Sequence, residues 1–200
     1  MFKKAIKGRI KIGMISFAGE IDSNLKNSMK IIYCNKEYAE QILNIFNEAI
    51  INSTALYDYN PRTIADMNNW FENKEKNNFP VIGLVDEEDN LLGFGSYGVF
   101  RAWPAYKYTV EHSLYIQKNQ RGKGLGKLLL EEIIKNAISQ DYHCLVAGID
   151  STNRASIGLH QALGFESCGI IKHAGYKFSE WLNLEFYQMI LPTPDYPTEE

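Results

Sequence analysis

The sequence predicts an α/β fold built around one mixed sheet, and three observations lead to this prediction. Segments with helical spacing of apolar residues alternate along the chain with segments of strand character. Residues 143–150 form a nearly continuous apolar run, which is typical of a strand buried on both faces. The chain has 200 residues, of which 45% are apolar and 22% are charged, enough for one sizeable core.

The first half of the domain is expected to contain two helices and three strands. In order, these are a strand at 29–34, helices at 36–51 and 63–76, and strands at 79–85 and 91–100. Both helices show apolar residues at intervals of three and four. Thr63 is the expected N-cap of the second, because its hydroxyl can accept a hydrogen bond from a free backbone N–H. An acidic turn at 86–90 joins the two later strands into a hairpin.

The second half is expected to alternate strands and helices. In order, these are a strand at 108–117, a helix at 124–140, a strand at 143–150, a helix at 153–163, and strands at 167–173 and 181–191. Leu125, Leu128, Leu129 and Ile133 form one stripe on the longer helix. Gly164 closes the shorter helix, since glycine readily adopts the left-handed conformation found at helix C-termini.

The ends of the chain are expected to lie outside the domain, which spans residues 29–191. Residues 1–28 form an uncertain appendage, and the sequence leaves open whether Met29 is the natural start. Lys7, Arg9 and Lys11 interrupt the apolar positions near the N-terminus, so a signal peptide is not predicted. Residues 192–200 contain three prolines and end in two glutamates, as expected of a loose tail.

Composition excludes several classes of protein. The net charge of −3 argues against a nucleic-acid partner, which usually meets a basic surface. The three cysteines, Cys34, Cys144 and Cys168, show no C-x-x-C spacing, and the histidines are far apart, so no metal site is predicted. Free thiols suit a reducing cytoplasm. No apolar stretch reaches the roughly 18 residues needed to cross a membrane, so no membrane partner is expected.

A glycine-rich segment, R-G-K-G-L-G at residues 121–126, is the most informative motif. It follows a predicted strand and opens a predicted helix, so its backbone N–H groups and the helix N-terminus can face an anion. It is not a Walker loop, because Arg121 stands where that loop needs glycine and Leu128 where it needs Ser or Thr. It is not the dinucleotide fingerprint either, because Lys127 occupies the last glycine position. The chemistry indicated is pyrophosphate binding.

The pattern R-x-x-G-x-G resembles the pyrophosphate loop of the GNAT (Gcn5-related) N-acetyltransferases. Two further features support the resemblance: the segment from Asn153 to the Gly164-Phe165 pair is similar to a later helix motif of that family, and the predicted element order matches its fold. The resemblance implies a mixed sheet of about six to seven strands with helices on both faces and a splayed parallel strand pair. It also implies acetyl-CoA as co-substrate, with no metal. The coenzyme-binding residues that it implies are Leu114, Tyr115, Ile116, Arg121, Gly122, Lys123, Gly124, Leu125, Gly126, Lys127 and Asn153.

A narrower resemblance concerns three separate segments. Residues 105–113, 146–150 and 174–181 are similar to the phosphinothricin acetyltransferase group, which acetylates the α-amine of phosphinothricin, methionine sulfoximine and methionine sulfone. This resemblance implies a small-molecule amine as the partner, and we expect its nitrogen to attack the thioester of acetyl-CoA directly in a ternary complex. Because the family often forms dimers, it also implies a homodimer.

Two residues are the candidate catalytic groups. Glu111 lies within an apolar strand, where a carboxylate is costly unless it is paired or functional, and burial would raise its pKa toward that of a useful base. The resemblance places the family's proposed base at this position. It also places a general acid at His160, where many members have tyrosine, although His160 could instead only pack beside the coenzyme. His112 alternates with Glu111, faces the other side of the sheet and is interpreted as structural.

The substrate pocket is predicted less sharply. Arg101 could bind a carboxylate or phosphinate, with Tyr106 and Tyr108 as pocket walls. Other aromatic candidates are Tyr57, Tyr59 and Trp103, and Lys177 and Trp181 lie in a segment that completes either the pocket or a dimer contact. Two rivals remain open: a protein N-terminal or lysine acetyltransferase, and a non-catalytic acyl-CoA sensor.

Overall fold

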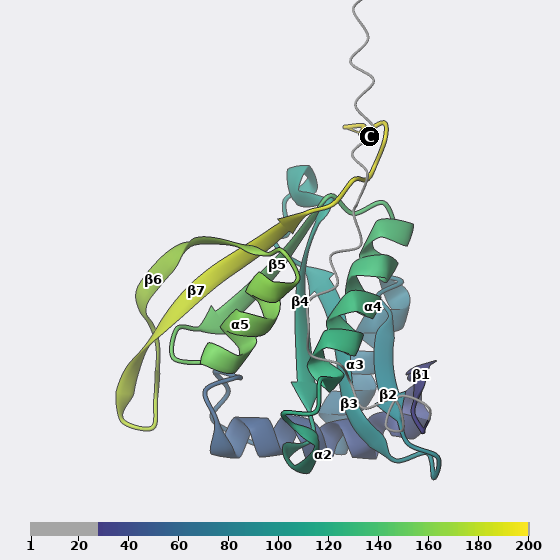
Figure 1. The fold of residues 1–200 in the computed structure, drawn as a ribbon, viewed down its shortest axis with the longest axis vertical. Coiled ribbons are helices and arrows are strands. Elements are labelled where there is room, and N and C mark those ends of the chain that lie inside the picture. The colour runs from purple at the N-terminus through teal and green to yellow at the C-terminus, as the bar shows by residue number, and fades with distance from the viewer. Residues whose placement is uncertain (1–27, 200) are drawn as a thin grey trace, which may run out of the picture.

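A computed structural model of the chain describes residues 28–199 and contains one seven-stranded sheet (Figure 1). The strand order is β1-β2-β3-β4-β5-β7-β6. The strands are β1 (Lys30–Tyr33), β2 (Val81–Val85), β3 (Leu91–Val99), β4 (Thr109–Ile116), β5 (Cys144–Asp150), β6 (Glu166–Lys177) and β7 (Glu180–Ile190). The helices are α2 (Ala39–Asn52), α3 (Ile64–Lys76), α4 (Leu125–Ser139) and α5 (Arg154–Ala162), with 3₁₀ turns η1 (Lys36–Tyr38), η2 (Pro104–Tyr106) and η3 (Lys118–Gln120).

The predicted order of helices and strands is confirmed, and the main difference lies in the last hairpin. The strand expected at 167–173 extends as β6 to Lys177. Ala174 and Gly175, which follow the predicted end, are weak strand formers. In the structure, Gly175 pairs with Leu182 of β7 across a register shift, so the pairing with β7 carries the strand past these residues.

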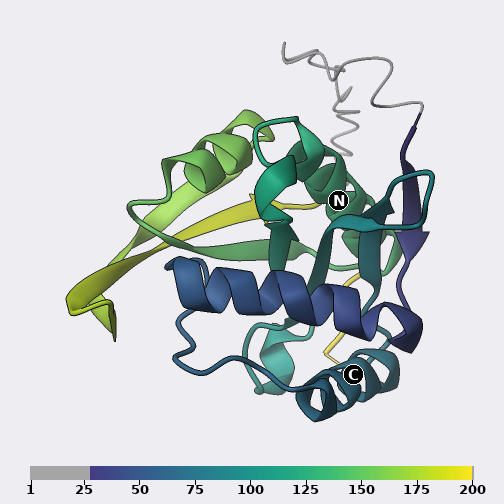
Figure 2. The ribbon, with the colours of Figure 1, turned by 90° about the horizontal axis from the view of Figure 1, so that it is seen from below.

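Helices cover both faces of the sheet, as predicted (Figure 2). Helices α2 and α3 pack on one face around Phe46, Met67 and Phe94. Helices α4 and α5 pack on the other around Leu129, Ile133 and further buried residues. Each core forms because the apolar stripe of a helix meets the alternate side chains of the strands.

The sheet is antiparallel except at β4 and β5, and these two parallel strands diverge. Their pairing ends at Glu111 and Val146, although β4 continues to Ile116 and β5 to Asp150. Each strand remains paired along its other edge, β4 with β3 and β5 with β7. The backbone edges that face each other beyond Glu111 therefore enclose a gap in the middle of the sheet. This gap is the splayed pair that the sequence resemblance implied.

Local sequence signals explain how several helices begin and end. Thr63 is the N-cap of α3, as predicted, and Asp66 accepts a hydrogen bond from its backbone N–H, which completes a capping box. Asn153 caps α5 by accepting a hydrogen bond from the Ser156 N–H. Gly164 follows α5 with a φ of 91°, the left-handed conformation that glycine tolerates best.

The two chain ends differ in what the structure describes. The predicted N-terminal appendage, residues 1–28, lies outside the described residues apart from Ser28. The described part of the predicted tail contacts the domain: the Thr193 hydroxyl donates to the Tyr142 carbonyl, and the Thr198 N–H donates to the Tyr108 hydroxyl. Within residues 28–199, no helix has the length and apolar character that crossing a membrane requires.

Candidate active site

Three adjoining cavities follow the gap between β4 and β5. The first, of about 690 Å³, lies against the glycine loop, and we call it the loop cavity. The second, of about 80 Å³, lies between the splayed strands, and we call it the cleft cavity. The third, of about 390 Å³, contains Glu111, and we call it the glutamate cavity. Ala55 and Tyr115 line all three cavities, so the three adjoin one another along the gap.

The loop cavity is bordered by the N-terminus of α4. Gly122 and Gly124 adopt φ values of 78° and 82°, which only glycine adopts readily, and Gly124 is the N-cap of the helix. A Cβ at Gly122 would meet nothing within 4 Å, so its backbone is open on the side where a side chain would stand. The first turn of a helix offers unbonded N–H groups and the positive end of the helix dipole. The residues present therefore suit the pyrophosphate of a nucleotide coenzyme.

The charged residues of the loop are held by neighbouring side chains. The Arg121 guanidinium donates from Nη2 to Glu48 of α2 at 2.5 Å and from Nε to the Ile116 carbonyl at 3.1 Å. Lys123 donates to the Gln120 side chain at 2.7 Å, and Lys127 lies 4.0 Å from Glu131. Arg121 thus ties the loop to the end of β4 and to α2. The lining of the cavity includes Arg121, Gly122, Gly124, Leu125 and Gly126 of the predicted loop.

The remaining predicted coenzyme residues lie along the same cavity. Leu114, Tyr115 and Ile116 come from the splayed half of β4, and Asn153 lies opposite them at the start of α5. The Tyr115 ring packs between Phe46 and Phe94, with ring centroids 5.1 and 5.5 Å away. Its side chain therefore belongs to the core beneath α2, and its backbone is the part that follows the gap.

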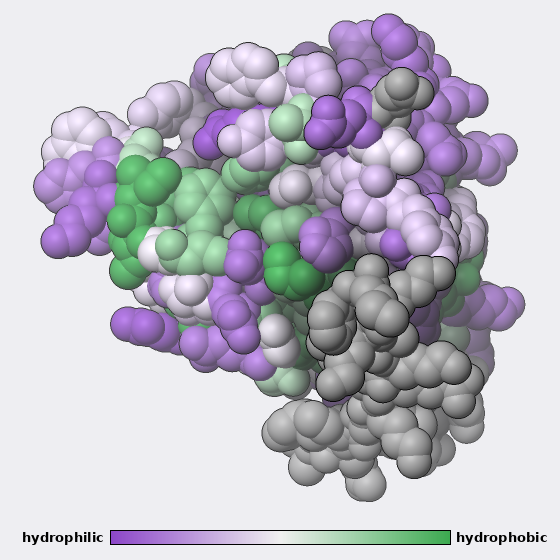
Figure 3. Space-filling view, turned by 90° about the horizontal axis from the view of Figure 1, so that it is seen from above, coloured by the Kyte–Doolittle hydropathy of each residue, from purple (hydrophilic) through white to green (hydrophobic). Residues whose placement is uncertain are grey.

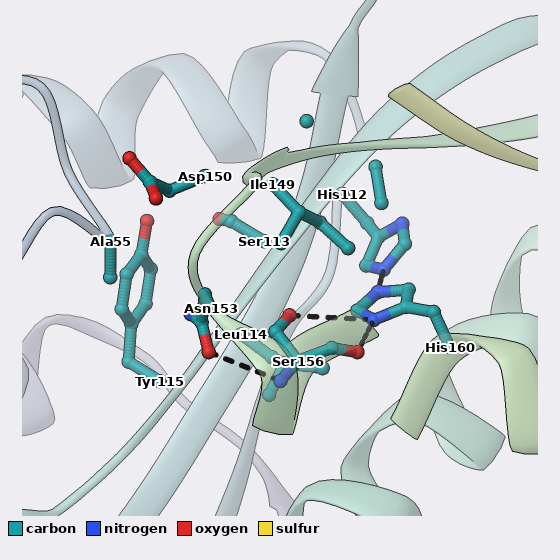
Figure 4. A pocket seen from close by; sticks show the side chains of 12 residues that line it. Ala55, His112, Ser113, Leu114, Tyr115, Ile149, Asp150, Asn153, Ser156 and His160 are labelled. Atoms are coloured by element: carbon teal, nitrogen blue, oxygen red, sulfur yellow. Dashed lines mark hydrogen bonds between the residues drawn. The ribbon is translucent and has the colours of Figure 1, made fainter. Parts of the chain in front are cut away.

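The cleft cavity holds a pair of buried histidines (Figure 4). His112 of β4 and His160 of α5 face each other with their Nε2 atoms 3.0 Å apart. His112 Nδ1 lies 2.9 Å from the Val146 carbonyl, and His160 Nδ1 lies 2.7 Å from the Ser156 carbonyl. Burial, together with repulsion from a protonated His160, lowers the pKa of His112 to about 3. Burial also lowers the pKa of His160, against a hydrogen bond to Ser156 that raises it.

The glutamate cavity contains the predicted base. Glu111 is half-buried on the α2 side of β4, and burial raises the pKa of its carboxyl, while the positive charge of Arg101 opposes the rise. Gly148 of β5 makes room for this side chain, since a Cβ at that position would lie 3.0 Å from Glu111 Oε1. Gly148 was not predicted from the sequence, because a glycine within an apolar strand does not indicate which side chain approaches it.

Two cations line the glutamate cavity, and the sequence analysis missed both. The Arg62 guanidinium lies 4.2 Å above the Phe46 ring and donates to Asp58 at 3.0 Å. Lys74 donates to the Tyr97 carbonyl at 2.6 Å, and burial lowers the pKa of its amine to about 8. Lys74 follows Trp70 by four residues on α3, a spacing that places both on one helix face and could have pointed to this site.

The predicted substrate residues lie elsewhere. Arg101 is exposed beyond β3, with its guanidinium 5.0 Å from the Phe100 ring centroid. Tyr106 also packs on Phe100, with the ring centroids 5.7 Å apart. The Tyr108 hydroxyl contacts Thr198 in the tail. All three stand outside the linings of the loop, cleft and glutamate cavities, although the charge of Arg101 reaches Glu111.

The β6–β7 hairpin clamps the segment that connects α2 to α3. The Lys177 ammonium, on a side chain that is only 5% exposed, donates to the carbonyls of Ile50, Ser53 and Leu56 at 2.6, 2.9 and 2.7 Å. The Tyr57 ring packs so closely on the hairpin that a Cβ at Gly175 would lie 2.7 Å from it. This segment lines the glutamate cavity, so Lys177 holds one of its walls without lining it.

The clamp also reaches the end of β5. The Tyr57 hydroxyl donates to Asp150 at 3.2 Å, and Asp150 accepts from the Thr152 N–H at 2.9 Å. Asp150 is buried and lines both the cleft and the glutamate cavities. Tyr59, another predicted pocket residue, is exposed and donates to the Tyr176 carbonyl at 2.6 Å. Trp103 is also exposed, so of the aromatic candidates it is Tyr57 that lines the glutamate cavity.

The arrangement joins an anion-binding helix N-terminus, a cleft with unpaired strand edges, and a half-buried carboxylate beside a separate cavity. Among residues 28–199, no group of three or more His, Cys, Asp or Glu side chains is placed to hold a metal ion. One cavity suits a phosphorylated carrier, and the other suits an acceptor with Glu111 beside it. Together they define the class of the protein as an acyltransferase.

Comparison with known proteins identifies the family. A model of the acetyltransferase (GNAT) family matches residues 40–165. An L-methionine sulfoximine/L-methionine sulfone acetyltransferase of Pseudomonas aeruginosa is 43% identical over 157 residues, covering 78% of this chain and 91% of that protein. The crystal structure of an N-acetyltransferase from Staphylococcus aureus Mu50 is 46% identical with a TM-score of 0.79, covering 81% of this chain and 98% of that one.

A further solved structure is similar and contains the coenzyme. The phosphinothricin acetyltransferase of Sinorhizobium meliloti, in complex with acetyl-CoA, is 32% identical with a TM-score of 0.79, covering 82% of this chain and 89% of that one. The chain belongs to the acetyltransferase (GNAT) family. The predicted family and fold class are thus confirmed, as is the similarity to the phosphinothricin and methionine sulfoximine group.

The Lys177 clamp yields a prediction about stability and substrate affinity. Lys177→Met removes the ammonium and leaves three carbonyls without this donor. The free energy of unfolding should therefore be about 1–3 kcal/mol lower than in the wild type. Because the wall of the glutamate cavity loosens, the KM for the amine should rise while the KM for acetyl-CoA changes little. Denaturant unfolding and steady-state kinetics measure both effects.

Lys172→Met is the matched control, because Lys172 is an exposed lysine on the same strand. It should leave stability and both KM values unchanged. Equal behaviour of the Lys177 and Lys172 variants would contradict the clamp.

Proposed function

We propose that this chain transfers the acetyl group of acetyl-CoA to the α-amine of a small amino-acid-like substrate of the phosphinothricin, methionine sulfoximine or methionine sulfone type. The observation that carries the proposal is the row of adjoining cavities that runs from the glycine loop, past the cleft cavity, to Glu111. The names of the similar enzymes from Pseudomonas aeruginosa and Sinorhizobium meliloti support the substrate class. The amine attacks acetyl-CoA directly while both substrates are bound.

In this proposal acetyl-CoA lies along the loop cavity. The backbone N–H groups of residues 122–126 bind its pyrophosphate, and Asn153 contacts it from α5. The pantetheine arm hydrogen-bonds to the unpaired edge of β4 at Leu114 and Ile116, much as an added strand would. A backbone N–H near Leu114 stabilises the oxyanion that develops on the thioester carbonyl. The open backbone at Gly122 and the divergence of β4 from β5 support this placement.

Glu111 acts as the general base. An α-amine arrives as an ammonium and must lose a proton before it attacks. The raised pKa of Glu111 makes it a better proton acceptor than an exposed glutamate would be. Gly148 keeps space beside Oε1, which suits an acceptor amine approaching between β4 and β5.

Arg62 and Lys74 take the carboxylate-binding role that the sequence suggested for Arg101. Both cations line the glutamate cavity, so they can bind the carboxylate of an amino acid whose amine faces Glu111. Arg101 lies outside the cavity lining and acts on Glu111 only through its charge. The cavity of about 390 Å³ is of a size suited to a small ligand.

A substrate panel tests the proposal. Thiol release from acetyl-CoA is measured with phosphinothricin, methionine sulfoximine, methionine sulfone, plain amino acids, polyamines and short peptides. We expect turnover with the first three, and we expect it to weaken when the α-carboxylate is replaced by an amide, because Arg62 and Lys74 lose their partner. Turnover with peptides alone would favour a protein acetyltransferase. No turnover in a chain that still binds acetyl-CoA would favour an acyl-CoA sensor.

Glu111→Gln tests the base. The amide keeps the shape of the side chain but cannot accept the proton, so kcat should fall by about 100-fold or more while acetyl-CoA binding is retained. In the wild type, kcat/KM for the amine should fall as Glu111 is protonated, at a pH above the ordinary glutamate pKa of about 4.3. Rate profiles against pH measure this acidic limb, which should be absent in the variant.

Glu180→Gln is the matched control, since Glu180 is exposed at the start of β7. An unchanged kcat in Glu111→Gln would remove Glu111 from the mechanism.

We also propose that the chain forms a homodimer through the β6–β7 hairpin. Figure 3 shows apolar surface on the side of the molecule where this hairpin lies. Ile170 and Ile171 are each 51% exposed there, and Trp181 is 60% exposed. Light scattering should give the mass of a dimer, and Ile170→Lys with Ile171→Lys should give that of a monomer. A wild-type monomer would contradict the proposal.

A further inference from the structure

His112 and His160 form an enclosed pair whose three polar contacts are all short. Both rings are buried, with 6% and 3% exposed, and their Nε2 atoms lie 3.0 Å apart. The outer nitrogens face backbone carbonyls, Val146 at 2.9 Å for His112 and Ser156 at 2.7 Å for His160. The Phe165 ring packs against both imidazoles. Neither ring can therefore turn to other partners without opening the core.

These contacts require a particular number of protons. A carbonyl can only accept, so each Nδ1 must carry a hydrogen to donate. In a neutral imidazole the other nitrogen is then bare, and two bare Nε2 atoms would face each other at 3.0 Å. If one ring carried its hydrogen on Nε2 instead of Nδ1, the contact between the Nε2 atoms would become a hydrogen bond. The Nδ1 of that ring would then be without a hydrogen and would face a carbonyl oxygen, which cannot donate. The Ser156 hydroxyl lies 3.5 Å from His160 Nδ1 and is too distant to replace the bond to its carbonyl.

We propose that His112 and His160 hold one additional proton between their Nε2 atoms at neutral pH and act as a single acid at the cleft cavity, with His112 as the positioning residue. One extra proton satisfies all three contacts at once, whereas each neutral arrangement loses one. A second extra proton would place two cations side by side in the core.

The surroundings of the pair carry few other charges. The titratable or charged groups on the elements around the pair are Glu111 and Tyr115 of β4, Asp150 of β5, Arg154 of α5 and Tyr187 of β7. Among the described residues, the one charge that shifts the pKa of either histidine is that of His160 acting on His112. Asp150 accepts from Thr152 and Tyr57, while Glu111 and His112 both line the glutamate cavity. From α4, the buried side chains that face this side of the sheet are leucine, isoleucine and alanine.

Two features other than a bonded carboxylate stabilise the extra proton of the histidine pair. The carbonyls of Val146 and Ser156 accept from the charged pair. His160 also lies in the last turn of α5, where the negative end of the helix dipole stabilises a cation. Burial opposes both, because it lowers the pKa of each imidazole, so the pair keeps its first proton through the shared Nε2 contact and not through either ring alone.

The role of this proton in the reaction rests on the proposed function. The amine nitrogen forms a bond to the acetyl carbon, and the carbon–sulfur bond then breaks with its electron pair left on sulfur. Glu111, which has by then passed the proton of the incoming ammonium to solvent, takes the surplus proton on nitrogen, and the thiolate takes the proton of the pair through His160. Solvent then returns a proton to the pair and removes one from Glu111. Ser156 and Asn153 line both the loop and the cleft cavities, so His160 adjoins the coenzyme path.

Nuclear magnetic resonance of the whole chain, labelled with ¹⁵N and free of coenzyme, tests the proton directly. Near neutral pH we expect both Nδ1 atoms to be protonated, with one further proton shared by the two Nε2 atoms. His112→Asn and His160→Asn assign this signal by removing it, and His173→Asn, at an exposed histidine, should leave it in place. Two bare Nε2 atoms at neutral pH, or a bare Nδ1 on either ring, would overturn the proposal whatever the activity of the chain.

A pH profile tests the role in catalysis separately. Wild-type kcat should fall on the basic side as the pair loses its proton. His112→Asn should move this basic limb to lower pH, because His160 then lacks the partner that helps it retain a proton, while His173→Asn should not move it. A basic limb that stays in place in His112→Asn would overturn the catalytic role.

Discussion

The divergence of β4 from β5 is the constraint on which the rest of the structure depends. Parallel strands that separate after Glu111 and Val146 leave peptide groups without their usual partners. A buried peptide group left unsatisfied costs about 1–3 kcal/mol, so the fold must either fill the gap or offer it to a ligand. The chain does both: His112 bonds to the Val146 carbonyl at the last paired position, and the edge beyond it borders the loop and cleft cavities. The site therefore lies where the sheet is incomplete.

The side chains of β4 alternate between the two faces of the sheet, so the proposed base and the histidine pair lie on different faces. Glu111 and Ser113 belong to the face covered by α2 and α3, where the cations of the glutamate cavity also lie. His112 and Leu114 belong to the face covered by α4 and α5. A proton acceptor and a proton donor can thus stand on opposite sides of one strand, close to the same gap.

The fold was largely predictable because its signals are local. Apolar periodicity predicted the helices, and Thr63 and Gly164 indicated where two of them begin or end. Residues 121–126 indicated an anion site between a strand and a helix. The two cations of the glutamate cavity were not predicted, because only tertiary packing brings Arg62 and Lys74 to the cavity that Glu111 lines. The contact between His112 and His160 was not predicted for the same reason, since 48 residues separate them in the sequence. Sequence alternation placed His112 opposite Glu111, but only the packing of α5 shows what it meets.

The central claim is that the unpaired edge of β4 and the glycine loop bind acetyl-CoA through their backbone. Hydrogen–deuterium exchange of the whole chain, measured with and without acetyl-CoA and with no amine present, tests this claim most directly. We expect slower exchange at the amides of Leu114, Ile116 and residues 122–126 when acetyl-CoA is bound, with exchange in β1 and β2 unchanged. Binding of acetyl-CoA without protection at these amides would contradict it.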